Sequence, residues 1–161
     1  MSARRTRIRQ LADKGNRLAY LTLASGTVTP IATTQGSLSA WRPFGVWSPD
    51  SKQIAFSDKT GSLYYLKVSD GKPILVDRNE WFNMGNYSWS PDSRWITYSK
   101  PQENFNGKIF IFDTKQNKKH QVTGNYYNDT NPVFDPEGKY IYFYSDRTFK
   151  PVYSDFDETW V

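Results

Sequence analysis

The phrase WSPDSKQIAF at Trp47–Phe56 decides the fold, because the chain repeats it as WSPDSRWITY from Trp89 and as FDPEGKYIYF from Phe134. The intervals of 42 and 45 residues match the period of about 40–45 residues that is typical of a four-stranded propeller blade. Apolar residues occupy the same positions in all three copies, and a shift by one residue would turn them to the other face of a sheet. The repeat therefore predicts an all-β chain in which equivalent modules bury the same face.

Each copy also contains a tight turn between two strands. Pro49 and Pro91 fix φ near the value needed at the second position of the turn. Gly138 in the third copy suits a positive φ, which Ser51 and Ser93 must adopt in the first two copies. The phrase is therefore interpreted as strand, turn, strand.

Two further strands follow each complete copy of the phrase. GSLYYLKVSDGKPILV from Gly61 aligns with GKIFIFDTKQNKKHQV from Gly107, and RLAYLTLASGTVTPIAT at residues 17–33 resembles the closing strand pair of an earlier module. Four strands per module predict a partial β-propeller of about three four-stranded antiparallel blades, incomplete at both ends.

These patterns divide the chain into a basic stretch at residues 1–16, which we expect to be disordered, and a propeller segment over the rest. We expect a blade remnant at residues 17–40, complete blades at 41–83 and 84–128, and a partial blade at 129–161. Because propellers close with about four to eight blades, the sequence is interpreted as a piece of a larger ring. Its incomplete modules should expose strand edges and blade faces, so we expect the isolated chain to associate.

The net charge of +5 is confined to residues 1–17, and the remaining residues are neutral overall. Phosphate backbones need clustered cations, so we expect no nucleic-acid partner. No stretch approaches the roughly 20 apolar residues of a membrane span, and no apolar run of a secretory signal follows the basic stretch. The sequence thus predicts a soluble chain without a membrane partner; it leaves the compartment open and favours the cytoplasm over the periplasm.

Candidate catalytic and metal-binding residues are few, and the chain has no cysteine. His120 is the only histidine, and its position in KKHQV favours a solvated strand end over a catalytic base. The serines that close the second strand of each module lack the Gly-x-Ser-x-Gly context of a nucleophile: they are Ser57, Ser99 and Ser145. One aspartate lies at the turn of each module, and turn hydrogen bonding explains it better than a calcium site does: these are Asp50, Asp92 and Asp135. We predict no catalytic residue, metal site or cofactor in this chain.

Aromatic residues make up 17% of the chain and alternate along the predicted strands. Tyr140, Tyr142 and Tyr144 alternate with apolar residues of the third copy, and an exposed row of this kind would be able to stack on sugars or bases. Packing between neighbouring blades, which cover both faces of a propeller sheet, is the simpler interpretation.

Beyond the repeated phrase, the chain from Trp47 to Asp157 resembles the tricorn protease family. The segments that carry this resemblance are SLYYLKV, YSWSPDSRWITYSK, KIFIFDTKQNKKHQVT and, above all, YNDTNPVFDPEGKYIYFYSDRTFKPVYSDFD at Tyr127–Asp157. The phrase WSPDSKQIAFSD alone is shared with TolB-like proteins and with the propellers of prolyl oligopeptidase relatives. The resemblance implies a large serine peptidase with a six-bladed and a seven-bladed propeller, of which this chain is part of the seven-bladed ring.

The catalytic residues of that family lie in later domains, so none is assigned to a position here. The resemblance implies a noncatalytic segment that scaffolds and channels peptides toward a catalytic domain absent from this chain. Two alternatives stay open: a TolB-like protein-interaction propeller without enzymatic activity, and the propeller of a prolyl-oligopeptidase-like hydrolase. The expected partners are peptides or other domains of the parent protein, with a homo-oligomer as a further possibility.

One stretch, SDRTFKPVYSDFDETW at residues 145–160, has more charge and more aromatic side chains than a simple hairpin needs. As a long loop it would direct Arg147, Lys150 and Tyr153 toward the channel of the ring, where they would contact a peptide. A solvated connection is the alternative interpretation.

Overall fold

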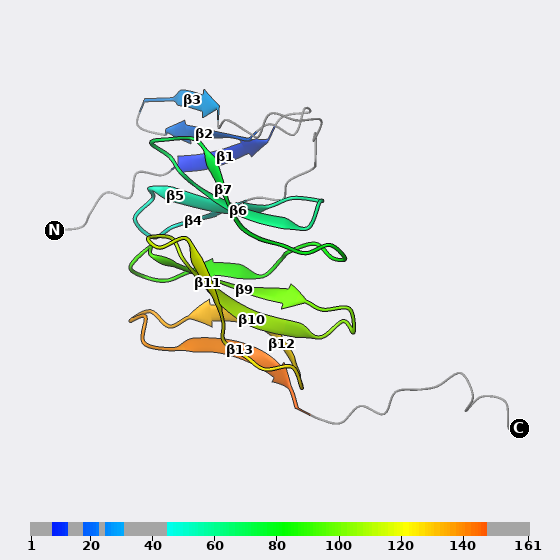
Figure 1. Cartoon of the computed structure of the whole chain (residues 1–161). Helices are drawn as coiled ribbons and strands as arrows, with labels where there is room; N and C mark the ends of the chain where they lie inside the picture. Colours follow the sequence, from blue (N-terminus) through cyan, green and yellow to red (C-terminus); the bar gives the residue numbers. More distant parts are fainter. Residues whose placement is uncertain (1–7, 13–17, 23–24, 31–44, 148–161) are drawn as a thin grey trace, which may run out of the picture.

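The computed structural model describes residues 8–12, 18–22, 25–30 and 45–147, which form β-strands in four antiparallel sheets stacked one on another (Figure 1). The described part of the chain contains no helix. Each sheet is built from strands that are consecutive in the chain, as the repeat predicts. The sheets therefore follow one another along the stack in the order of the sequence.

The first sheet has three strands in the order β1-β2-β3, namely β1 Ile8–Ala12, β2 Leu18–Thr22 and β3 Thr27–Pro30. Strand β1 lies inside residues 1–16, so five residues of the stretch that the sequence analysis expects to be disordered form a strand. The physical reason is backbone pairing: β1 aligns in register along β2, whose edge offers hydrogen-bonding groups to any extended segment. The positive net charge of residues 1–16 gives no information about this strand pairing.

The second and third sheets are complete four-stranded modules, in which the first strand lies at one edge and the fourth at the other. The second sheet consists of β4 Val46–Trp47, β5 Gln53–Ser57, β6 Ser62–Lys67 and β7 Pro73–Arg78. The third sheet consists of β8 Tyr87–Trp89, β9 Trp95–Pro101, β10 Gly107–Asp113 and β11 Lys118–Gln121. These strands lie within the ranges 41–83 and 84–128 that the sequence delimits.

The fourth sheet contains the two strands β12 Asn128–Phe134 and β13 Ile141–Asp146. Their register shifts between Thr130 and Val133, where Asn131 has a φ of 53°. Pro132 follows at this irregularity, which is where a strand tolerates a residue without an N–H group. Strand β12 begins one residue before the expected boundary at 129.

The main apolar core lies between the second and third sheets. Its buried members are Ala55, Leu63, Tyr65, Val76, Met84, Trp89, Ile96, Tyr98 and Phe112. A second cluster of Ile54, Phe56 and Leu66 covers the other face of the second sheet. Aromatic rings thus pack between modules, which confirms the packing interpretation for Tyr65, Trp89 and Phe112.

The register of the repeated phrase is the same in the three copies. Ile54 and Phe56 are fully buried, as are Ile96 and Tyr98 at the equivalent positions of the third sheet. In the fourth sheet the equivalent residues, Ile141 and Phe143, are half-buried, whereas Tyr140, Tyr142 and Tyr144 are 65%, 60% and 73% exposed. For these three tyrosines the packing interpretation was wrong in this chain, because no described segment covers their face of β13.

The turn prediction is confirmed. Ser51 and Ser93 both have a φ of 61°, and Gly138 has a φ of 74° at the same position of its turn. The second turn of each module also repeats, since Gly26, Gly71 and Asn117 all have positive φ. Each of these three hairpins therefore has a residue of left-handed conformation before its closing strand.

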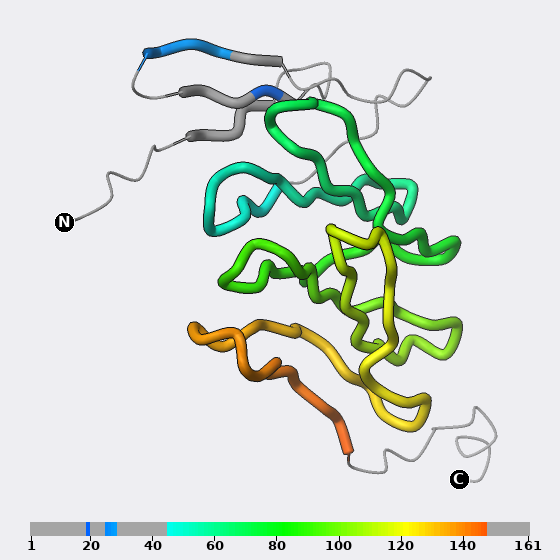
Figure 2. Tube along the Cα trace, turned by 60° about the vertical axis from the view of Figure 1, so that its left-hand side comes forward, coloured from blue at the N-terminus to red at the C-terminus, as the bar shows by residue number. Residues whose placement is uncertain are grey.

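Antiparallel order places the connections at two ends of the stack. Tight turns join the first strand to the second and the third to the fourth, and we call this the turn end. The loop end carries residues 58–61, 79–86, 102–106 and 122–127, which join the second strand to the third and one sheet to the next. In Figure 2 the turns after β4, β8 and β12 lie in a row on the left, and the loop-end connections lie on the right.

Candidate functional site

The loop end carries the exposed aromatic side chains of the connections. Trp81, Phe105, Tyr126 and Tyr127 are exposed there, and they come from three different loops. Among the described residues of the turn end, Tyr140 is the exposed large apolar side chain. Exposed aromatic groups are common at surfaces that bind other chains, so the loop end is the candidate recognition surface.

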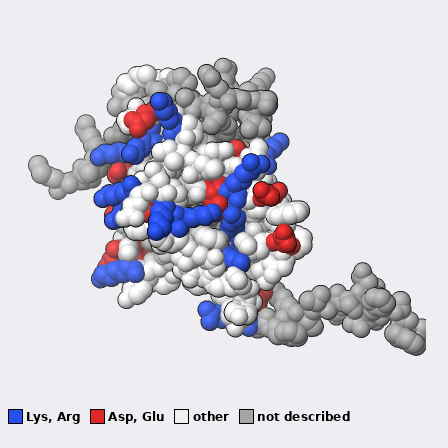
Figure 3. All heavy atoms as spheres, viewed as in Figure 1, with Lys and Arg blue, Asp and Glu red and all other residues white. Residues whose placement is uncertain are grey.

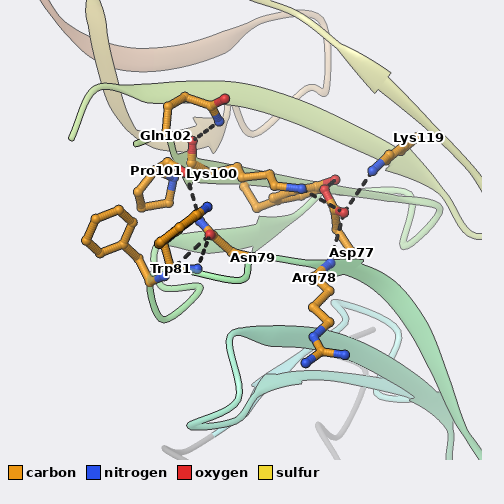
Figure 4. A network of polar contacts seen from close by, with 10 residues as sticks. Asp77, Arg78, Asn79, Trp81, Lys100, Pro101, Gln102 and Lys119 are labelled. Carbon is orange, nitrogen blue, oxygen red and sulfur yellow. Dashed lines mark hydrogen bonds and ion pairs between the residues drawn. The ribbon is translucent and has the colours of Figure 1, made fainter. Parts of the chain in front are cut away.

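A buried carboxylate lies beneath this surface and joins the second sheet to the third (Figure 4). Asp77, at the end of β7, is 6% exposed. Its Oδ2 accepts a hydrogen bond from the Tyr98 hydroxyl at 3.0 Å, and its Oδ1 accepts from Lys100 Nζ at 3.1 Å and from Lys119 Nζ at 2.8 Å. All three donors belong to the third sheet, so Asp77 links two modules by charge as well as by packing.

The surroundings of Asp77 keep it ionised. Burial alone would raise the pKa of the carboxyl group, but the hydrogen bonds from Lys119 and Lys100 outweigh burial and lower the pKa below its ordinary value of 3.8. Burial and the nearby carboxylate raise the pKa of Tyr98, so its hydroxyl stays protonated and donates. The Asp77 carboxyl group is therefore charged and the Tyr98 hydroxyl is protonated near neutral pH.

Beside this cluster is a cavity of about 640 Å³, which we call the loop-end pocket. It lies between the end of β7, loop 79–86, the end of β9 and loop 102–106, and Lys100 and Lys108 line it. Asn79 shapes one wall, since its Nδ2 donates to the Pro101 carbonyl at 2.7 Å and its Oδ1 accepts from Trp81 N at 3.0 Å. Figure 4 shows Arg78 pointing away from Lys100, on the opposite side of the backbone.

Basic side chains are also prominent on the face of the stack seen in Figure 1. Figure 3, in the same view, shows Lys and Arg groups crossing the middle of this face with acidic groups among them. Lys118 and Lys119 of β11 are both exposed. The neutral overall charge after residue 17 therefore conceals a local excess of lysine.

Of the three residues that the sequence proposed as peptide contacts, Arg147 lies at the loop end, directly after β13. Its guanidinium group lies over the Tyr127 ring at 5.2 Å from the ring centroid, and its Nε donates to Ser145 Oγ at 3.2 Å. Lys150 and Tyr153 lie outside the described residues. The proposed contact set of the three residues therefore stays a prediction.

The other residues that the sequence analysis considered as catalytic or metal-binding candidates lie in surroundings typical of structural residues. His120 is exposed on β11, and in the described part of the chain no serine hydroxyl hydrogen bonds to it. Ser99 is buried and donates to the Asp129 carbonyl at 3.0 Å. Asp50 accepts from Lys52 N at 3.0 Å within its turn.

Turn hydrogen bonding also explains the other two aspartates. Asp92 accepts from Arg94 N at 3.1 Å, and Asp135 accepts from Tyr140 N at 2.7 Å and from Glu137 N at 3.1 Å. Over the described ranges no three His, Asp or Glu side chains lie close enough together to hold a metal ion. The same ranges contain no helix long and apolar enough to cross a membrane.

The Asp77 cluster and the loop-end pocket were missed in the sequence. One signal was available, because Asp77 interrupts the apolar run ILV of a predicted strand. A charge at that place requires a partner. Which lysines supply it depends on how two sheets meet, and the repeat does not specify this.

Comparison with known proteins identifies the family. A family model described as the tricorn protease second beta propeller domain matches residues 6–158. The tricorn-like protease C-terminal subunit of Sulfurisphaera tokodaii is 32% identical over 104 residues, which are 65% of this chain and 12% of that protein. The crystal structure of the tricorn protease superposes with a TM-score of 0.73 at 19% identity, over 86% of this chain and 14% of that one.

TolB from Acinetobacter baumannii gives a TM-score of 0.60 at 20% identity, over 87% of this chain and 36% of TolB, and this likeness shows the propeller fold alone. The expected all-β partial propeller is thus confirmed, and the chain spans only about an eighth of the tricorn relatives described above. The match over nearly the whole chain shows that it belongs to the family of the second β-propeller domain of tricorn proteases.

Proposed function

We propose that this chain is a noncatalytic propeller segment of a tricorn-like serine peptidase, in which it scaffolds and guides peptides toward a catalytic domain elsewhere in the parent protein. The family match over residues 6–158 carries this proposal. The exposed position of the single histidine, His120, agrees with a role outside the chemistry. The proposed partners are peptides and the other domains of the parent protein.

The first strands of successive sheets supply the surface that we assign to peptide passage. Strands β4, β8 and β12 each lie at the edge of a sheet and contact one another in turn. Trp89 Nε1 donates to the Val46 carbonyl at 2.9 Å, and Ser88 Oγ donates to the Pro132 carbonyl at 3.1 Å. These bonds hold neighbouring edge strands in a fixed wall, beside which Val46 and Val133 are partly exposed.

The test is to narrow the proposed passage in the parent peptidase by the substitution Val133→Trp. We expect turnover of peptides of ten or so residues to fall, while turnover of a dipeptide reporter, which needs less width, stays unchanged. Val122→Trp is the matched control, because Val122 is similarly exposed but lies on a loop away from the first strands. Equal turnover of long peptides by both variants and the unmodified enzyme would count against the proposal.

Arg147, Lys150 and Tyr153 are retained as proposed peptide contacts in this setting. The position of Arg147 at the loop end, over the ring of Tyr127, supports its part in the proposal. Arg147→Ala in the parent protein should raise the KM for peptides with little change in kcat, since a binding contact is lost. An unchanged KM would remove Arg147 from the proposed set.

A further inference from the structure

Two lysines face each other across adjacent strands at the loop-end pocket. Lys100 of β9 and Lys108 of β10 are direct partners in the antiparallel register, so their side chains leave the same face of the sheet. Like charges in this arrangement destabilise a sheet. A negative charge near the two lysines would offset their repulsion.

The chain itself supplies less negative charge than the lysines require. The Asp77 carboxylate is shared between Lys100 and Lys119, so one negative charge serves two lysines. Lys108 forms no ion pair with any residue that the structure describes. Two ammonium groups therefore share a single buried carboxylate, and the ammonium group of Lys108 has no carboxylate partner among the described residues.

The two acidic residues that line the loop-end pocket do not correct this imbalance. Glu80 and Glu103 are exposed, and neither pairs with Lys100 or Lys108 among the described residues. Trp81 is exposed beside the pocket, on the same side as Pro101 (Figure 4). The pocket thus combines an unneutralised ammonium group, amide side chains and an aromatic surface.

We propose that the loop-end pocket binds a carboxylate group of a peptide, with Lys108 as its principal cation and Trp81 as a contact for the adjoining peptide residue. An incoming carboxylate accepts hydrogen bonds from Lys108 and relieves its repulsion with Lys100. The carboxylate belongs either to the C-terminus of the peptide or to an acidic side chain. This inference rests on the proposed role in guiding peptides, and it names the chemical group by which they are held.

The test is isothermal titration of the intact 161-residue chain with three hexapeptides of alanine and leucine at low salt. The first peptide has a free C-terminal carboxylate, the second is amidated, and the third is amidated but carries one internal glutamate. We expect the amidated peptide to bind about tenfold more weakly than the first, which corresponds to one charge-assisted hydrogen bond. Binding of the third peptide shows whether the carboxylate of an acidic side chain can also occupy the pocket.

Variants assign the binding to the pocket. Lys108→Gln should weaken binding of the free-carboxylate peptide about tenfold, and Lys108→Arg should largely retain it because the charge remains. Lys67→Gln, which changes an exposed lysine at the turn end, should have no effect. Equal affinity for the free and amidated peptides, no measurable binding of any peptide, or normal binding by a folded Lys108→Gln chain would each overturn the proposal.

These outcomes are separate from those that test the proposed function. Peptide turnover after Val133→Trp reports on passage along the first strands, whereas titration of the isolated chain reports on the loop-end pocket alone. Loss of binding in Lys108→Gln together with unchanged turnover in Val133→Trp would retain the pocket and reject the passage. The reverse combination would reject the pocket and retain the passage.

Discussion

At the residue scale, the fourth position of the repeated turn has the same backbone conformation in the three copies of the phrase, but the chain fills it with different residues. Ser51 and Ser93 adopt a φ of 61° there, and only Gly138 occupies the left-handed region without steric cost. At Ser93 a hydrogen bond between modules offsets this steric cost, because Ser93 Oγ accepts from Asp50 N at 3.0 Å. No side-chain hydrogen bond of Ser51 accompanies its turn among the described contacts.

We therefore expect Ser51→Gly to stabilise the chain by about 0.5 kcal/mol, since relief of the left-handed strain exceeds the added freedom of the unfolded glycine. Ser93→Gly should instead destabilise it by about 0.5 kcal/mol, because the contact between modules is lost. Urea unfolding of the two variants measures both changes. Equal shifts in the two variants would show that the hydrogen bond of Ser93 contributes nothing.

A second residue-scale prediction concerns acid stability. The two-pronged hydrogen bonding of Arg94 to Asp113, with Nη2 to Oδ2 at 2.6 Å and Nε to Oδ1 at 3.1 Å, lowers the pKa of Asp113 from 3.8 to about 2. Because the folded pKa lies below the unfolded one, this pair stabilises the chain above pH 3.8 and ceases to do so as the pH falls toward 2.

The free energy of unfolding should therefore be lower for Asp113→Asn than for the unmodified chain at pH 7. This difference should shrink as the pH is lowered from about 4 to about 2. Denaturant titrations at several pH values give the difference directly. A gap that stays constant down to pH 2 would mean that the Asp113 carboxylate is not the source of the stability.

At the element scale, adjacent sheets approach so closely at the loop end that one strand must begin with glycine. A Cβ atom on Gly107, at the start of β10, would lie 2.5 Å from the Asp129 carbonyl oxygen of β12 and 2.7 Å from Ser99 Oγ. Gly107 N also donates to Asn128 Oδ1 at 2.8 Å. The third and fourth sheets are therefore joined through a position that has no room for a side chain.

Gly107→Ala should destabilise the chain by about 2 kcal/mol, the usual cost of forcing an extra group into a packed contact. Gly124→Ala is the control, because a Cβ atom there meets nothing within 4 Å. Thermal unfolding of both variants tests the contact. A Gly107→Ala chain as stable as the control would mean that the two sheets separate easily.

At the scale of the whole molecule, the stack ends in a sheet face that no described segment covers. Tyr140, Tyr142 and Tyr144 form an exposed row on β13, and Val133 of β12 is also exposed. In the second and third sheets the corresponding strands face a further sheet. An exposed aromatic row beside a strand edge that pairs with no described segment favours association, as the sequence predicted.

The double substitution Tyr142→Lys and Tyr144→Lys should shift the isolated chain toward the mass of one molecule in sedimentation velocity experiments. Two added positive charges on one face disfavour its contact with another copy. Tyr126→Lys is the control, since Tyr126 is exposed on a loop and away from this face. If the unmodified chain already sediments as a monomer, the predicted association is wrong.

The sequence by itself determined the module, its period, its register and its turns. These are local properties, because side-chain alternation and turn conformation depend on residues that are near one another in the chain. Trp89 and Ile96, for example, are buried as the repeated phrase predicts. The motifs around the phrase also identified the tricorn family, which the family match confirms.

Only the tertiary structure decided which charges meet. Asp77 and Lys119 are 42 residues apart and belong to different sheets, and the facing of Lys100 and Lys108 depends on the register of two strands across a loop. The pairing of β1 with β2 likewise joins a basic stretch to a strand whose edge it completes. Such contacts form where elements that are distant in the sequence pack against each other. The residues next to a side chain in the sequence do not determine which side chain it meets in this packing.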